Sequence, residues 1–115
     1  MKQKVSMKTP VLVTIALFAA SAISLRAADA KALYEQQCQK CHGADGKGDT
    51  KMGKKLAAKD YTDPKVQAEL KDDAAFKAIK DGFKDKEDKV LMKPIEGASD
   101  DEVKALVAYM RTFKK

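Results

Sequence analysis

Apolar residues along this 115-residue chain recur mostly at intervals of three and four, which is the period of an α-helix. A first helix is predicted over residues 30–41 and is followed by Gly43, a residue suited to ending it. Its apolar side comprises Ala30, Leu33, Tyr34 and Cys38. Downstream of residue 30 no stretch alternates apolar and polar residues as a half-buried strand would, so the pattern predicts an all-α domain.

The last predicted helix has the clearest start. Ser99 and Glu102 have the spacing of a capping box, in which each side chain binds a backbone N–H of the other residue's segment. The apolar residues that follow at helical spacing are Val103, Leu106, Val107, Met110 and Phe113. This stripe predicts a C-terminal helix packed on the core.

Two shorter helices are predicted between these two. Asp63 and Pro64 supply an N-cap and a first-turn proline for a helix that carries Val66 and Leu70. Asp72 or Asp73 is expected to cap another helix, which turns Ala75, Phe76 and Ile79 inward and stops at Gly82. The Gly- and Lys-rich segment 43–60 and the segment 83–98 are predicted to be loops.

The first thirty residues have the three parts of a secretory signal peptide: a lysine-rich head, an apolar run from Val11 to Leu25, and small residues after Arg26. Arg26 closes the run short of the roughly 20 apolar residues that span a bilayer, so cleavage is expected rather than a retained anchor. Ala28-Asp29-Ala30 permits a cut after Ala30, with cuts after Ala27 or Ala28 as alternatives. The sequence therefore predicts signal 1–30, a mature domain over 31–115, and a periplasmic protein.

Removal of the signal also changes the charge of the protein. The full chain has 23 basic and 17 acidic residues; the mature part has 19 and 16, a net charge of +3. Its lysines are interspersed with carboxylates and no aromatic residues alternate with them, which argues against nucleic-acid binding. About 85 residues form one small domain, for which apolar burial alone gives marginal stability.

Cys38-Gln39-Lys40-Cys41-His42 is the most informative motif of the chain. Cys-x-x-Cys-His is the spacing at which two thiols attach a haem covalently while the next residue ligates its iron. A disulfide is the ordinary alternative in an exported protein, but a bridge across two residues closes a very small loop and would stabilise little. A thioredoxin-like site lacks its βαβ setting, and structural zinc usually takes four ligands where this chain has two Cys and one His.

A haem bound by His42 has a second axial position. Because the chain has no other histidine, that position is left to a methionine, a lysine, the terminal amine or no residue at all. Met110 lies on the apolar stripe of the last helix and is expected to be a packing residue. Met92 lies in an apolar cluster, Val90 to Ile95, fifty residues from His42, and is the preferred candidate. Met52 is the fallback. The alternative for Met92 is a loop residue that fills a gap.

These residues resemble the small class I cytochromes c of bacterial periplasms over essentially all of the mature chain. The resemblance rests on the helix ending in Cys38 to Gly43, on Met92 with a following proline, and on the closing helix around Leu106 to Arg111. It implies an all-α cytochrome c fold, in which four or so short helices wrap one covalently bound haem c and the N- and C-terminal helices cross. In that crossing, Ala30 and Tyr34 would face Leu106 and Tyr109.

The resemblance also implies the role of each site residue. Cys38 and Cys41 would form the thioether bonds, His42 would be the proximal ligand and Met92 the distal one. The family usually has methionine directly before proline, whereas Lys93 intervenes here. It also tends to have a proline whose carbonyl accepts the proton of the proximal histidine, and Lys54 occupies about that position.

The implied function is one-electron transfer by a soluble, monomeric periplasmic carrier with no catalytic residues and no stable membrane insertion. Expected partners are redox proteins such as a membrane cytochrome complex, a terminal oxidase or a reductase. Lysines near the haem-binding segments are candidates for docking acidic partners: Lys40, Lys47, Lys86, Lys89 and Lys93. The alternative function is a haem-based sensor or small-ligand-binding protein in which Met92 is absent from the iron. An enzyme such as a peroxidase would call for a second haem motif.

Overall fold

The computed structural model describes residues 19–115; residues 1–18, which hold much of the predicted signal, lie outside them. The described chain is mostly helical. Its helices are α1 (Ala19–Gln37), α2 (Gln39–His42), α3 (Lys51–Lys55), α4 (Pro64–Glu69), α5 (Asp72–Asp81) and α6 (Asp100–Arg111). Strands β1 (Phe83–Lys84) and β2 (Val90–Met92) form one antiparallel hairpin. Within residues 19–115 no helix is both long and apolar enough to cross a membrane.

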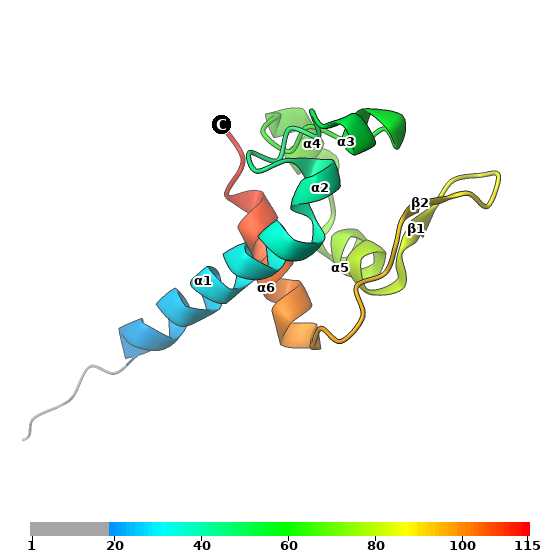
Figure 1. Cartoon of the computed structure of the whole chain (residues 1–115). Coiled ribbons are helices and arrows are strands. Elements are labelled where there is room, and N and C mark those ends of the chain that lie inside the picture. Colours follow the sequence, from blue (N-terminus) through cyan, green and yellow to red (C-terminus); the bar gives the residue numbers. More distant parts are fainter. Residues whose placement is uncertain (1–18) are drawn as a thin grey trace, which may run out of the picture.

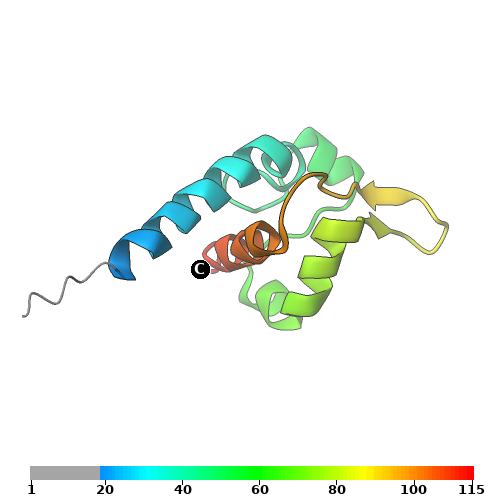
Figure 2. The same ribbon diagram turned by 90° about the horizontal axis from the view of Figure 1, so that it is seen from below.

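The long helix α1 crosses α6, as Figures 1 and 2 show. Ala30 is buried at this crossing, and the fully buried Tyr34 stacks at an angle on Tyr109 and Phe113, with ring centroids 5.1 and 5.3 Å apart. Such tilted aromatic pairs stabilise the fold beyond the contribution of their buried apolar area. The prediction that the first and last helices cross with Tyr34 facing Tyr109 is confirmed.

The core is one cluster built around α6. Its buried members are Tyr34, Cys38, Ala75, Ile79, Val103, Leu106, Val107 and Met110. The capping box of Ser99 and Glu102 is present at the start of α6. The buried residues of α6 are therefore four of the five that the sequence predicted, and Met110 is a packing residue. The fifth, Phe113, lies beyond the end of α6 and is partly buried against the core.

The predicted helix boundaries need two corrections. Residues 30–41 do not form one helix, because the helix is interrupted at Cys38, which separates α1 from α2. In addition, α1 begins earlier than predicted, at Ala19. The N-cap of α5 is Lys71, and Asp72 and Asp73 lie in the first helical turn instead. Carboxylates in a first turn still interact favourably with the positive end of the helix dipole.

Both predicted loops contain short regular elements. The first loop contains α3, which Thr50 caps by accepting a hydrogen bond from the Gly53 N–H. The second contains the hairpin, whose turn is held by the Asp85 carboxylate as it accepts bonds from the backbone of Glu87 and Lys89. Strands of two and three residues are too short to give a period in the sequence, which is why the hairpin was not predicted.

A polar network ties the end of α6 to residues 61–72. The buried amide of Gln67 donates to the carbonyls of Tyr61, at 2.7 Å, and Met110, at 2.9 Å. The Arg111 guanidinium donates to the Gln67 carbonyl at 2.6 Å, the Gln67 side-chain oxygen at 3.0 Å, and the Leu70 carbonyl at 2.6 Å. It also pairs with the exposed Asp72 carboxylate at 2.7 Å. One guanidinium therefore satisfies several acceptors in α4 and in the short connection between α4 and α5.

Candidate functional site

The Cys-x-x-Cys-His motif forms the corner between α1 and α2. Cys38 is the N-cap of α2, its N–H bonds to the Tyr34 carbonyl at 2.8 Å, and its own carbonyl accepts the His42 N–H at 3.0 Å. The motif is therefore one turn of chain attached to the crossing helix α1. Cys38 is buried, Cys41 and His42 are half-buried, and both cysteines are free thiols.

The carbonyl groups of three successive residues at the end of α2 each accept a hydrogen bond. Thr50 Oγ1 donates to the Cys41 carbonyl at 2.8 Å, the Gly48 N–H donates to that of His42 at 2.8 Å, and the Tyr34 hydroxyl donates to that of Gly43 at 2.6 Å. The last carbonyls of a helix lack partners within the helix, so such contacts fix its end. The motif is therefore rigid on the side that faces residues 43–53.

Gly53 lies directly against this motif. A Cβ at Gly53 would lie 2.3 Å from the carbonyl oxygens of both Cys41 and Gly48, and 2.9 Å from Thr50 Oγ1. The close approach of α3 to α2 requires a residue without a side chain here. The sequence placed Gly53 in a loop, and its packing role was not predicted.

His42 has the properties of a neutral ligand. Burial lowers the pKa of its imidazole, which favours the uncharged ring with one nitrogen lone pair free to bind a metal. Its Nδ1 is buried and has no hydrogen-bond partner within residues 19–115, so the Lys54 carbonyl does not accept a proton from it here. The nearest ring is that of Tyr61, with centroids 5.6 Å apart.

The cysteine thiols also fit covalent attachment to a haem. Burial, and then the neighbouring Cys41, raise the pKa of the Cys38 thiol to about 11, so it stays protonated at neutral pH. Two free thiols and a neutral imidazole on one turn make up the donor set that a c-type haem uses. The residues present therefore fit this cofactor.

The structure places the three candidate methionines in different settings. Met110 is inside the core, Met52 is half-buried in α3, and Met92 ends β2 as a half-buried residue packed against the core cluster. Met92 therefore has a fixed position beside the core without being enclosed in it. The lysines proposed for docking are all exposed: Lys40, Lys47, Lys86, Lys89 and Lys93.

Sequence reasoning missed the residues that hold the site in place. Thr50, Gly53 and Tyr61 act through single contacts with the motif that are formed only after the chain folds. Their neighbours in sequence give no signal of these contacts. The cap position of Thr50 before α3 is the one local signal that could have been used.

Comparisons with known proteins agree with this geometry. The family described as Cytochrome c matches residues 27–114. A solved structure titled KustC0563 c-type cytochrome has a TM-score of 0.66 and 38% sequence identity, over 76% of this chain and 99% of its own. The structure of a KustC0563 mutant with one tyrosine replaced by phenylalanine has a TM-score of 0.63 and 36% sequence identity, over 75% of this chain and 99% of its own. No curated protein sequence matches the chain.

Proposed function

Since the chain belongs to the cytochrome c family, we propose that it is a monohaem c-type cytochrome that carries single electrons between redox proteins in the periplasm. The family implies covalently bound haem c and a role in electron transfer. In this proposal Cys38 and Cys41 form the thioether bonds, His42 is the proximal ligand and Met92 the distal one. The all-α fold with crossing terminal helices is that of the family.

The observation that carries the proposal is the fixed corner of Cys38, Cys41 and His42. A bound haem supplies an iron that gains and loses one electron. His42 offers a neutral nitrogen, and the hydrogen bonds to the carbonyls of residues 41–43 fix the backbone that carries the ring. A rigid ligand limits rearrangement between the two oxidation states, which suits electron transfer.

Met92 supports the carrier function over the sensor function. A thioether favours the reduced iron relative to more electron-donating ligands and so raises the reduction potential. Met92 is held beside the core by β2 and its packing. As the distal ligand, a residue held in this way would not leave the iron easily and would keep small ligands out. A sensor would need that position to be free or easily vacated.

The Met92→Ala variant tests this ligation. We expect the oxidised wild-type protein to show the weak red sulfur-to-iron charge-transfer band, and Met92→Ala to lose it. Met52→Ala is the matched control and should keep the band, because Met52 lies in α3 and not on β2. Absorption spectra of the oxidised proteins measure both.

A high-spin spectrum of the oxidised wild-type protein would contradict ligation by Met92. Rapid binding of carbon monoxide by the reduced wild-type protein would do the same and would favour the ligand-binding alternative. Loss of the band in Met52→Ala but not in Met92→Ala would transfer the distal role to Met52.

The exposed lysines support weak, fast association with acidic redox partners. Lys40 lies inside the haem motif, and Lys86, Lys89 and Lys93 lie on or beside the hairpin that carries Met92. Electrostatic complementarity of this kind raises association rates more than affinity. We propose docking through the face where these two segments meet the cofactor.

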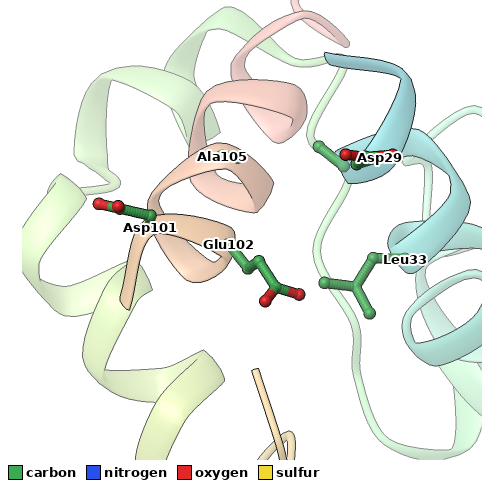
Figure 3. A pocket seen from close by; sticks show the side chains of 6 residues that line it. Asp29, Leu33, Asp101, Glu102 and Ala105 are labelled. Carbon is green, nitrogen blue, oxygen red and sulfur yellow. The ribbon is translucent and has the colours of Figure 1, made fainter. Parts of the chain in front are cut away.

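We also propose export with removal of the signal, and the burial of Ala30 favours a cut before that residue. Ala27, Ala28 and Asp29 are exposed, whereas Ala30 is 4% exposed and packs at the α1–α6 crossing. Figure 3 shows this region, where Asp29 and Leu33 of α1 line a pocket with Asp101, Glu102 and Ala105 of α6. A cut after Ala30 would remove a buried contact.

The mass of the exported protein tests this cleavage site. We expect a mature chain that begins at Ala28 or Asp29, because either start keeps Ala30 in place. Its new amine would lie at or next to Asp29, which lines the pocket together with Glu102, and neighbouring carboxylates favour a positive charge. Intact-protein mass spectrometry separates these products from a chain that begins at Lys31, which would contradict the assignment.

A further inference from the structure

The segment that carries Met92 is attached to the C-terminal end of α5. The Ile95 N–H donates to the Ile79 carbonyl at 2.9 Å, and Ile79 is itself 2% exposed in the core. Gly82 ends α5 with a φ of +83°, which turns the chain directly into β1 of the hairpin. The hairpin therefore extends from a firmly packed helix end, as Figures 1 and 2 show.

Gly82 approaches the backbone of this segment closely. A Cβ at Gly82 would lie 2.8 Å from the Met92 carbonyl oxygen, and 3.0 and 3.1 Å from the Cδ and N of Pro94. These atoms belong to the backbone and a proline ring, so they cannot turn away as the end of a flexible side chain would. The position thus requires glycine for two reasons, its positive φ and the space.

Phe83 lies directly across the hairpin from Met92. The two residues are partners in the antiparallel pair, beside an irregularity in the register between Phe83 and Lys84. Directly paired residues have side chains on the same face with Cβ atoms about 5 Å apart. That separation brings the ring within reach of a sulfur–aromatic contact. Phe83 is 55% exposed, so its ring lies at the surface of the hairpin rather than in the core.

We infer that the end of α5 positions Met92, with Gly82 and Phe83 as its positioning residues; the inference rests on the proposed ligation by Met92. A proline restricts the backbone of the residue before it, which here is Lys93 and not Met92. Pro94 therefore does not set the backbone of Met92 directly. Instead, the close approach of Gly82 to the Met92 carbonyl and to Pro94 fixes the backbone of Met92.

Gly82→Ala tests this inference, with Gly97→Ala as its matched control. Both glycines have a φ near +80°, but a Cβ at Gly97 meets no atom within 4 Å. Backbone strain is therefore common to the two variants, and displacement of Met92 is expected only in Gly82→Ala. The measurements are the sulfur-to-iron band and the affinity of the oxidised holoprotein for added imidazole.

In Gly82→Ala we expect a weakened band and about ten-fold tighter imidazole binding, the factor that corresponds to roughly 1.4 kcal/mol of lost iron–sulfur bonding. Gly97→Ala should match the wild type in both. A purely structural role would lower the thermal stability of both variants and leave the imidazole affinity unchanged. Equal imidazole affinities in the two variants would overturn the inference.

Phe83→Ala provides a second variant that should fold normally, because its ring is largely exposed. Val90→Ala is its control, since Val90 is also an exposed apolar residue of the hairpin but pairs with Lys84. We expect tighter imidazole binding only in Phe83→Ala. If Phe83→Ala and Val90→Ala bound imidazole equally well, the positioning role of Phe83 would be wrong.

The failure of this inference can be told apart from failure of the proposed function. If Met92→Ala keeps the sulfur-to-iron band, Met92 is not the ligand and the proposed ligation fails. If Met92→Ala loses the band while Gly82→Ala and Gly97→Ala behave alike, the ligation stands and only the positioning role of α5 is wrong.

Discussion

Gly53→Ala should lower the free energy of unfolding by about 3 kcal/mol, at the upper end of what overpacking usually costs. This sign is the reverse of the usual one, because alanine inside a helix is ordinarily more stable than glycine by about 0.5–1 kcal/mol. The reversal arises because a methyl group at Gly53 would lie 2.3 Å from the carbonyl oxygens of Cys41 and Gly48.

Neither carbonyl can move away at low cost. The Cys41 carbonyl accepts the Thr50 hydroxyl, and Thr50 also caps α3 through the Gly53 N–H. The segment that contains Gly48 is tied to the motif through the bond from its N–H to the His42 carbonyl. Relief of the clash would separate α3 from α2 and break these contacts, so we also expect a smaller yield of protein with covalently attached haem.

Denaturant unfolding of the holoproteins measures the effect, and Gly97→Ala is again the control. Gly97 has a positive φ and open space, so its replacement should cost only the backbone strain, about 1 kcal/mol. If Gly53→Ala were as stable as the wild type, the packing of α3 on the motif would be looser than the structure shows.

The elements that could be predicted from sequence are those with local signals. The capping box of α6, the Asp63 cap with Pro64 in the first turn of α4, and the glycines that end α2 and α5 all lie where the sequence placed them. The Cys-x-x-Cys-His motif is also a local signal, because it consists of five consecutive residues.

The parts that could not be predicted depend on contacts between distant residues. Gln67 is polar and lies between Val66 and Leu70, yet it is 5% exposed because its amide reaches the Met110 carbonyl, 43 residues away. Likewise, Gly53 and Gly82 are typical loop or helix-end residues in sequence, and only the folded structure shows which backbone each one touches. Periodicity and capping rules contain no information about such pairs.

Arg111→Met should destabilise the holoprotein by about 3 kcal/mol. It would remove the guanidinium from the Gln67 and Leu70 carbonyls and from the Gln67 side chain, and those acceptors lie in a partly buried region. Hydrogen bonds from a charged donor typically contribute about 1.5–3 kcal/mol each, and buried acceptors without a partner retain a desolvation penalty. Since Arg111 is partly exposed, water replaces some of these bonds and limits the loss.

Arg111→Lys should recover less than half of this loss. The planar guanidinium reaches Gln67, Leu70 and Asp72 from two nitrogens at once, whereas one ammonium cannot occupy both positions. Asp72→Ala removes the ion pair but keeps the contacts of Arg111 with the Gln67 and Leu70 carbonyls, so it measures the contribution of the ion pair alone. It should cost only about 1 kcal/mol, because the Asp72 side chain is 73% exposed and exposed ion pairs contribute little.

Denaturant unfolding compares these three variants, and the sulfur-to-iron band of the oxidised protein is recorded beside it. Arg111 contacts neither Met92 nor His42, so the band should persist in every variant that folds while stability falls in the order Asp72→Ala, Arg111→Lys, Arg111→Met. If Asp72→Ala were as damaging as Arg111→Met, the surface ion pair and not the carbonyl contacts would hold α6 to residues 61–72. If the band were lost together with stability, the Gln67–Tyr61 hydrogen bond would also help to hold the His42 ring, which lies beside the Tyr61 ring.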